Sequence, residues 1–145
     1  MSSFGPHLLA GTVVGGIGTT ATIVGMPEFS AMCFLPFVAS VAGALTPDMD
    51  IKSKSSMFMY LLYVVTASIL FVCGYPGWAF LLLVYSLIPQ FFGHRGFIHS
   101  FVFGLLSTVG LGMICAYNGI EMGITAGIIG SYFFGFLTHI ALDET

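Results

Sequence analysis

The sequence predicts an all-α membrane protein, a polytopic bundle of about six hydrophobic helices that forms a single domain over residues 1–145. Of its residues, 57% are hydrophobic and only 6% are charged, whereas soluble domains carry about 25% charged residues. The apolar residues are grouped into six runs, most of them near the length of about 17–25 residues that a membrane-spanning helix needs. The strict alternation of a membrane β-barrel is absent.

The six runs cover residues 8–24, 31–45, 57–73, 78–92, 97–116 and 120–142, and glycine, proline or charged residues interrupt them. We expect Pro6 at the first position of the first helix, and Gly11 with Gly15 in a G-x-x-x-G pair that suits close helix packing. The first two runs are short enough to be tilted or re-entrant. The three cysteines, Cys33, Cys73 and Cys115, lie singly in apolar runs. We therefore expect them to be buried and to pack as small hydrophobic residues.

If successive runs cross the membrane alternately, the polar residues sort to one end of the bundle. This end receives every histidine of the chain and three aspartates: His7, Asp48, Asp50, His94, His99, His139 and Asp143. The opposite end receives Glu28 and Glu121. Such sorting is improbable for unrelated polar residues, so the sequence predicts one polar site at one end of the bundle.

The basic residues indicate the orientation of the bundle. Lys52, Lys54 and Arg95 are the only basic side chains, and all three fall at the end with the histidines. The positive-inside rule therefore predicts that the site and both termini are cytoplasmic. A net charge of -3 with three basic residues argues against a nucleic acid as partner, because phosphate binding needs clustered Lys and Arg.

Mixed imidazole and carboxylate donors suit zinc first, with manganese or iron as alternatives. His139 and Asp143 are four residues apart and share a helix face, and Asp48 and Asp50 flank a single residue. Seven candidate ligands exceed the needs of one ion, so we expect one to three. Taken singly, each histidine is more often a satisfied polar group, and Asp48 a turn residue; their common location favours a shared metal site.

A metal site of this kind predicts hydrolysis. Paired metal ions activate water and stabilise both oxygens of a phosphoester displacement. Asp48 or Asp50 is the candidate general base, and Arg95 either stabilises the developing negative charge or anchors the chain at the membrane surface. A site in the membrane favours a lipid or lipid-linked substrate over a soluble nucleotide, so membrane lipids are the expected partners.

Four segments in order resemble a known family: His7 to Gly11, Pro47 to Asp50, the His94-Arg95-Gly96-Phe97-Ile98-His99-Ser100 stretch, and His139 to Asp143. This order is similar to that of the YdjM-like, LexA-regulated bacterial inner-membrane proteins, which are described as predicted metal-dependent hydrolases. They are regarded as distant relatives of zinc-dependent phospholipase C and P1 nuclease. The resemblance implies an all-helical fold and a metal-activated water that attacks an ester. It also implies that the seven histidines and aspartates are ligands or near-ligands.

The resemblance further implies an inner (cytoplasmic) membrane location in a bacterium, or a phage-encoded origin. Two departures stand out: the sequence ends two residues after Asp143, and Thr46 precedes Pro47 where an aliphatic residue is expected.

Two other functions remain open. One is a non-enzymatic protein that binds, senses or transports a metal, and the other is a small phage-type pore-forming or structural membrane protein.

Overall fold

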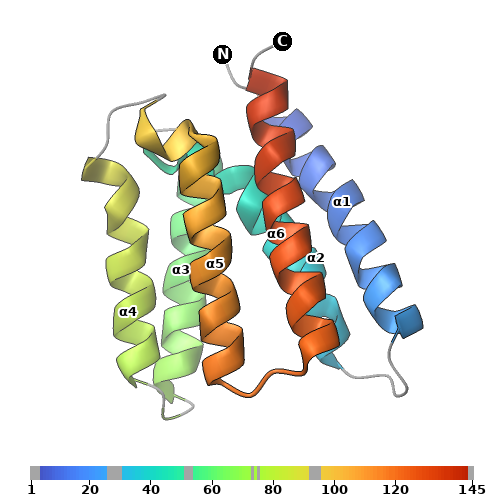
Figure 1. Cartoon of the computed structure of the whole chain (residues 1–145). Helices are drawn as coiled ribbons and strands as arrows, with labels where there is room; N and C mark the ends of the chain where they lie inside the picture. Colours follow the sequence, from blue (N-terminus) through green and yellow to red (C-terminus); the bar gives the residue numbers. More distant parts are fainter. Residues whose placement is uncertain are drawn as a thin grey trace.

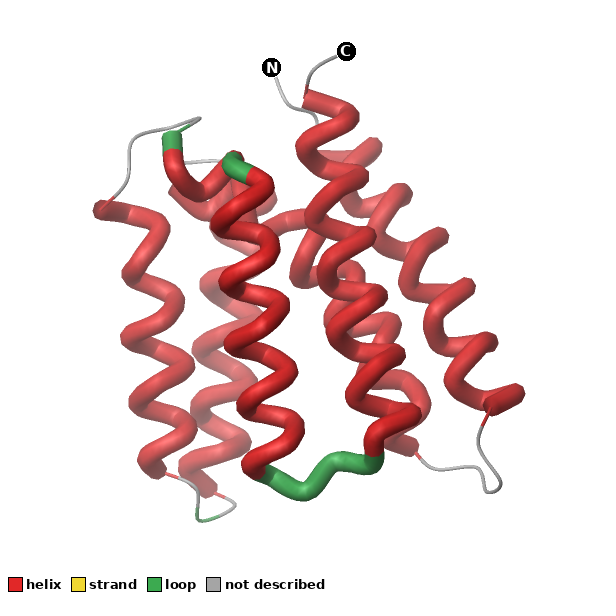
Figure 2. Tube along the Cα trace, viewed as in Figure 1, coloured by secondary structure: helices red, strands yellow, loops and turns green. Residues whose placement is uncertain are grey.

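The computed structural model describes residues 4–25, 31–50, 54–72, 74, 76–91 and 96–143, with the backbone alone at positions 31, 50, 54, 55, 70, 89 and 90. Nearly all of these residues are helical, and no strand occurs among them (Figure 2). The predicted all-α bundle is confirmed.

Six α-helices follow one another: α1 (Phe4–Gly25), α2 (Leu35–Leu45), α3 (Lys54–Val72), α4 (Pro76–Leu87), α5 (Phe101–Tyr117) and α6 (Met122–Asp143). Short 3-10 helices extend or join them: η1 (Ala31–Phe34), η2 (Thr46–Asp50), η3 (Ile88–Phe91) and η4 (Phe97–His99). Successive α-helices run in opposite directions (Figure 1). The start of α1, η2, η4 and the end of α6 therefore lie at the same end of the bundle.

Within the described ranges, three segments are long and apolar enough to cross a membrane: Phe4–Gly25, Met32–Met49 and Met122–Asp143. The first two runs, which we expected to be short or re-entrant, are among them, because η1 and η2 lengthen the 11-residue α2 at both ends. The other apolar helices are shorter, at Ser56–Ile69, Pro76–Leu87 and Phe101–Tyr117. Full crossing by these three, and the cytoplasmic orientation, stay predictions.

Two helix starts differ from those predicted. Helix α1 begins at Phe4, so Pro6 is its third residue and not its first. This position is tolerated because the first four N–H groups of a helix have no acceptor within it. Helix α5 begins at Phe101 because Ser100 caps it: its Oγ accepts a hydrogen bond from the Phe103 N–H at 3.1 Å.

Helix α2 is the centre of the fold, packed most extensively against α6 and next against α1, which also contacts α6 (Figure 1). Gly11 and Gly15 are buried on α1 where α2 approaches: a methyl group at Gly11 would meet Ala44, and one at Gly15 would meet the backbone of Phe37. The close packing predicted for the G-x-x-x-G pair is confirmed.

The remaining helices join this three-helix unit at its edges. Helix α5 packs on α6, and α3 packs on α4, with η2 linking that pair to α2. Cys33 and Cys115 are free and buried, as predicted, and Cys73 lies outside the described residues.

Candidate metal centre

Five of the predicted site residues come together from four segments at one end of the bundle. His7 lies in the first turns of α1, Asp48 on η2, His99 on η4, and His139 with Asp143 in the last two turns of α6. Donor atoms of four of them, Asp48, His99, His139 and Asp143, lie within 4.8 Å of one another. Residues up to 136 positions apart in the chain thus share one site.

The two oxygens of the Asp143 carboxylate face different histidines. Oδ1 lies 3.3 Å from His7 Nε2, and Oδ2 lies 3.4 Å from His139 Nε2 and 3.5 Å from His99 Nε2. His139 Nε2 is also 3.6 Å from Asp48 Oδ1. Three imidazole nitrogens therefore surround one carboxylate, and the second carboxylate approaches from η2.

The ring of His139 is held by the backbone of α2. Its Nδ1 lies 2.7 Å from the Ala44 carbonyl oxygen, and because a carbonyl only accepts, Nδ1 carries the proton. The carbonyl is available because α2 ends at Leu45, and Pro47, three residues on, has no N–H to donate. This bond leaves the Nε2 lone pair directed at Asp48 and Asp143, the arrangement that outer-shell partners give a metal-binding histidine.

The spacing of the donor atoms fits a bound cation. With metal–ligand bonds of about 2.0–2.1 Å, tetrahedral ligands lie about 3.3–3.4 Å from one another, and the four measured distances are 3.3–3.6 Å. A lone pair aimed at two carboxylates in a buried setting costs free energy unless a cation lies between them.

Protonated histidines would satisfy the carboxylates less well. The rings of His7 and His139 are stacked, with centroids 4.0 Å apart and an interplanar angle of 22°. Two charged rings at this separation repel by about 4 kcal/mol at an effective dielectric constant of about 20. Neutral rings whose nitrogens bind a metal avoid this repulsion, so the donor set fits a divalent metal.

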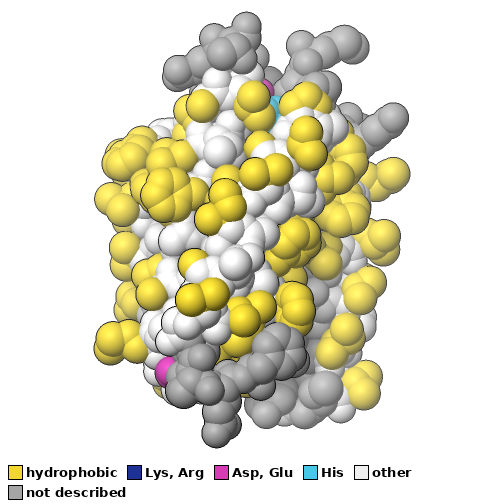
Figure 3. Space-filling view, turned by 90° about the vertical axis from the view of Figure 1, so that its right-hand side faces the viewer, with side chains coloured by type: hydrophobic (Ala, Val, Ile, Leu, Met, Phe, Trp, Pro, Cys, Tyr) yellow, Lys and Arg dark blue, Asp and Glu magenta, His cyan; other side chains and the backbone are white. Residues whose placement is uncertain are grey.

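The site is buried on one side and accessible on the other. Asp48 and His139 are fully buried, whereas the His99 side chain is 9% exposed and that of Asp143 is 12% exposed. Figure 3 shows histidine and acidic atoms reaching the surface in one small patch at this end, within a largely hydrophobic surface. Among the described ligands, His99 and Asp143 therefore form the exposed edge of the site.

The family model of the YdjM inner membrane proteins matches residues 1–145, the whole sequence. The chain belongs to the YdjM inner membrane protein family. The predicted family is thereby confirmed, and the distant relation to zinc-dependent phospholipase C and P1 nuclease stays a prediction. No curated protein and no solved structure matches the chain.

Three residues predicted for the site of this YdjM family member cannot be placed. His94 and Arg95 lie outside the described residues, and of Asp50 only the backbone is described, at the end of η2. Lys52 also lies outside the described residues. The roles of His94, Asp50 and Arg95 stay predictions. Ser100 is engaged as the cap of α5, which agrees with its absence from the predicted site.

Three features of the site escaped the sequence analysis. One is the Ala44 carbonyl, and another is Tyr60, whose hydroxyl donates to the Met49 carbonyl at 2.9 Å and holds η2 in place. The third is the crossing of α2 and α6, where a methyl group at Gly43 would collide with the Tyr132 carbonyl and one at Gly135 with that of Ser40. The sequence features that could have pointed to them are the glycines in the second and sixth apolar runs and Pro47 before the aspartates.

Proposed function

We propose that this YdjM family member is a membrane-embedded, metal-dependent hydrolase that cleaves a phosphoester, with a lipid or lipid-linked substrate, at the cytoplasmic face of the inner membrane. One observation carries the proposal: His7, Asp48, His99, His139 and Asp143 converge at one end of the bundle with donor spacings that suit a metal ion. Polar clusters of this kind in a membrane are costly, and they usually serve a function.

Asp48, His99, His139 and Asp143 would hold the first ion, and zinc is the best match to imidazole and carboxylate donors, with manganese or iron as alternatives. One Asp143 oxygen faces His7 and the other faces His99 and His139, so Asp143 and His7 would be available to hold a second ion. A bound divalent ion lowers the pKa of water and polarises the phosphoryl oxygens. The proposed site holds one to three ions.

The two aspartates of η2 take different proposed roles. Asp48 is fully buried beside His139, which suits a ligand that orients the site. Asp50 follows at the end of the same 3-10 helix and is our candidate to accept the proton of the attacking water. Arg95, four residues before His99, would bind the phosphoryl oxygens through its planar guanidinium group.

A second function, metal transport, has some support from the structure. Thr19 and Ser40 are buried, and their hydroxyl oxygens have no hydrogen-bond partner among the described residues. These groups place polar atoms deeper in the bundle than the site, where an ion leaving the site would pass. Metal uptake into proteoliposomes that depends on Ser40 would favour transport over hydrolysis.

The test of the hydrolase combines metal analysis with a substrate panel. We expect detergent-purified protein to carry stoichiometric zinc or manganese and to cleave a phospholipid or a chromogenic phosphodiester. His99→Ala and Asp143→Asn should abolish both properties. Glu121→Gln is the matched control, because Glu121 is an exposed carboxylate at the opposite end of the bundle. Metal content and cleavage that survive in His99→Ala, or that fall equally in Glu121→Gln, would contradict the proposal.

A further inference from the structure

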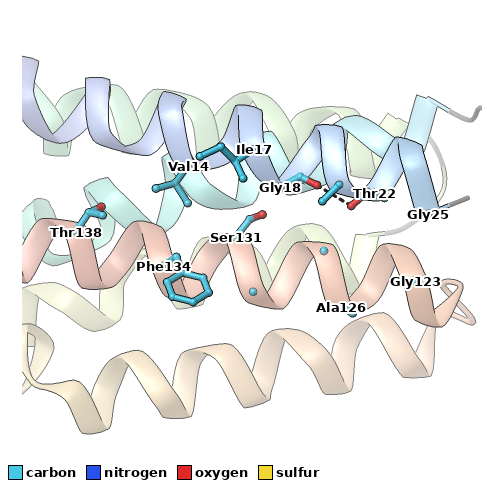
Figure 4. A pocket seen from close by; sticks show the side chains of 13 residues that line it. Val14, Ile17, Gly18, Thr22, Gly25, Gly123, Ala126, Ser131, Phe134 and Thr138 are labelled. Atoms are coloured by element: carbon cyan, nitrogen blue, oxygen red, sulfur yellow. Dashed lines mark hydrogen bonds between the residues drawn. The ribbon is translucent and has the colours of Figure 1, made fainter.

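An open groove of about 550 Å³ lies between α1 and α6, separate from the donor residues of the site (Figure 4). Val14 and Ile17 line it from α1, and Gly130 and Phe134 line it from α6. Its volume falls within the range of about 300–1,000 Å³ that is typical of ligand pockets. Its lining is almost wholly apolar, so a ligand of matching chemistry is a hydrocarbon.

Close contacts between the two helices form the floor of the groove. A methyl group at Gly18 would collide with Ser131, and one at Gly127 with Thr22. The Thr22 hydroxyl is satisfied by the Gly18 carbonyl at 2.9 Å. Ser131 is 5% exposed and lines the groove.

The groove runs along the helices toward the site. On α6 its lining extends from Gly123 to Thr138, the residue before His139, which is about 22 Å of helix. On α1 it extends to Val14, seven residues or about two turns after His7, and therefore on the same helix face. One leaflet of hydrocarbon is about 15 Å deep. The groove is long enough for a whole lipid chain, and one of its ends lies toward the site.

We infer that this groove binds an acyl chain of the lipid substrate, with the phosphoester held at the metal centre. The inference rests on the proposed hydrolase function and specifies its substrate as a lipid bound by its chain. Helices α1 and α6 are both long and apolar enough to span the membrane, so the groove is open to the hydrocarbon of the bilayer and a lipid enters it sideways.

A second copy of the chain fits the groove less well than a single acyl chain. Close packing of membrane helices needs small residues whose backbones are free to be approached, and Gly18 and Gly127 are already covered by Ser131 and Thr22 of the same chain. The walls also project: Ile17 is 67% exposed and Phe134 is 60% exposed. The projecting side chains leave a narrow slot between them. A helix of a second copy would instead need a flat face to pack against.

The binding test uses a phosphatidylglycerol that carries a diazirine on one acyl chain, added in trace amount to the metal-loaded protein in nanodiscs. We expect photolabelling to concentrate on α1 and α6 along the groove. Gly130→Leu should reduce this labelling about tenfold by filling the groove, since an added side chain there meets nothing within 4 Å. Gly110→Leu on α5 is the matched control, because its site is equally open. Ala126→Leu, also in the groove, repeats the test in case Gly130→Leu misfolds.

Equal labelling in Gly130→Leu and Gly110→Leu would overturn the inference, as would a cross-link between two copies through Ala126. A series of phosphoesters with one headgroup and lengthening chains gives the kinetic test. For water-soluble members of the series, each methylene that moves from water into the groove should raise kcat/KM about fourfold, which corresponds to about 0.8 kcal/mol, and Gly130→Leu should lower the ratio of long-chain to short-chain kcat/KM at least tenfold. Groove labelling without hydrolysis would refute the proposed function alone. Hydrolysis with labelling that ignores Gly130 would refute the groove alone.

Discussion

The α2–α6 crossing and the α3–α4 pair hold their helices together in different ways. At the crossing, Gly43 and Gly135 bring the two backbones into contact. In the α3–α4 pair, large side chains meet, and Tyr63 contacts Tyr85 edge-on with ring centroids 6.2 Å apart. Backbone contact leaves little freedom for side chains to rearrange. The candidate metal centre is built on the crossing, where His139 reaches a carbonyl of α2 directly.

The difference teaches that the site depends on backbone position at the crossing and only indirectly on the α3–α4 pair. That pair reaches the site through η2, where the Tyr60 hydroxyl donates to the carbonyl of Met49 and Met59 of α3 packs in one apolar cluster with Met49. Changes at the crossing should therefore alter metal binding strongly, and changes in α3 or α4 weakly. The predictions below test this order of effects.

The largest effect is expected from His139→Ala. The substitution removes a fully buried donor that faces both Asp48 and Asp143, and it leaves two carboxylates without their shared partner. We expect metal affinity to fall by more than about 100-fold, beyond the 10–100-fold typical of outer-shell changes. Competition with a chelator measures the metal affinity of both proteins. Metal bound as tightly in His139→Ala as in the unaltered protein would exclude this residue as a ligand.

Acidification should release the metal. A histidine must be neutral to bind a metal, so protons compete with the ion, and affinity should fall as the pH is lowered through the range of about 8 to 5 in which imidazole titrates. None of the described histidines lies on α3 or α4, so the loss should accompany loosening of the α1–α2–α6 unit. The metal content is measured after dialysis at each pH. The hydrogen-exchange rates of α6 and α3 are compared at the same pH values. Retention independent of pH would contradict histidine ligation.

Gly135→Ala should have the next largest effect. The added methyl group would collide with the Ser40 carbonyl, and overpacking of this kind costs about 1–3 kcal/mol. We expect a lower unfolding temperature and weaker metal binding together. Gly77→Ala on α4 is the control, because a methyl group there meets nothing within 4 Å and alanine is favoured in helices by up to about 1 kcal/mol. A similar loss in both variants would remove the distinction between the two regions.

The smallest effect is expected from Tyr60→Phe. It removes one hydrogen bond to the Met49 carbonyl, worth about 0.5–1.5 kcal/mol, while the ring keeps its packing. Metal affinity should fall by less than about tenfold because Asp48 moves with η2 but stays in reach of His139. A loss as large as that of His139→Ala would show that the α3–α4 pair controls the site more directly than the structure indicates.

Much of the site was predictable because its chemistry is carried by residue types that are rare in this chain. Histidines and aspartates in apolar surroundings stand out, and alternate crossing assigns them to one end without any contact being known. Four predicted ligands, Asp48, His99, His139 and Asp143, do lie within reach of one another. The helix starts at Phe4 and Phe101 were less predictable, because local capping by Ser100 decides where helix α5 begins.

The sequence by itself determined the membrane class, the number of helices and the end of the bundle at which the histidines gather. These follow from composition and from the order of apolar runs, which act along the chain. Only the tertiary structure decided which carbonyl orients His139, how Asp143 faces three histidines at once, and where α1 and α6 leave a groove. These depend on how closely helix backbones approach, and a glycine in an apolar run does not reveal which neighbour it faces.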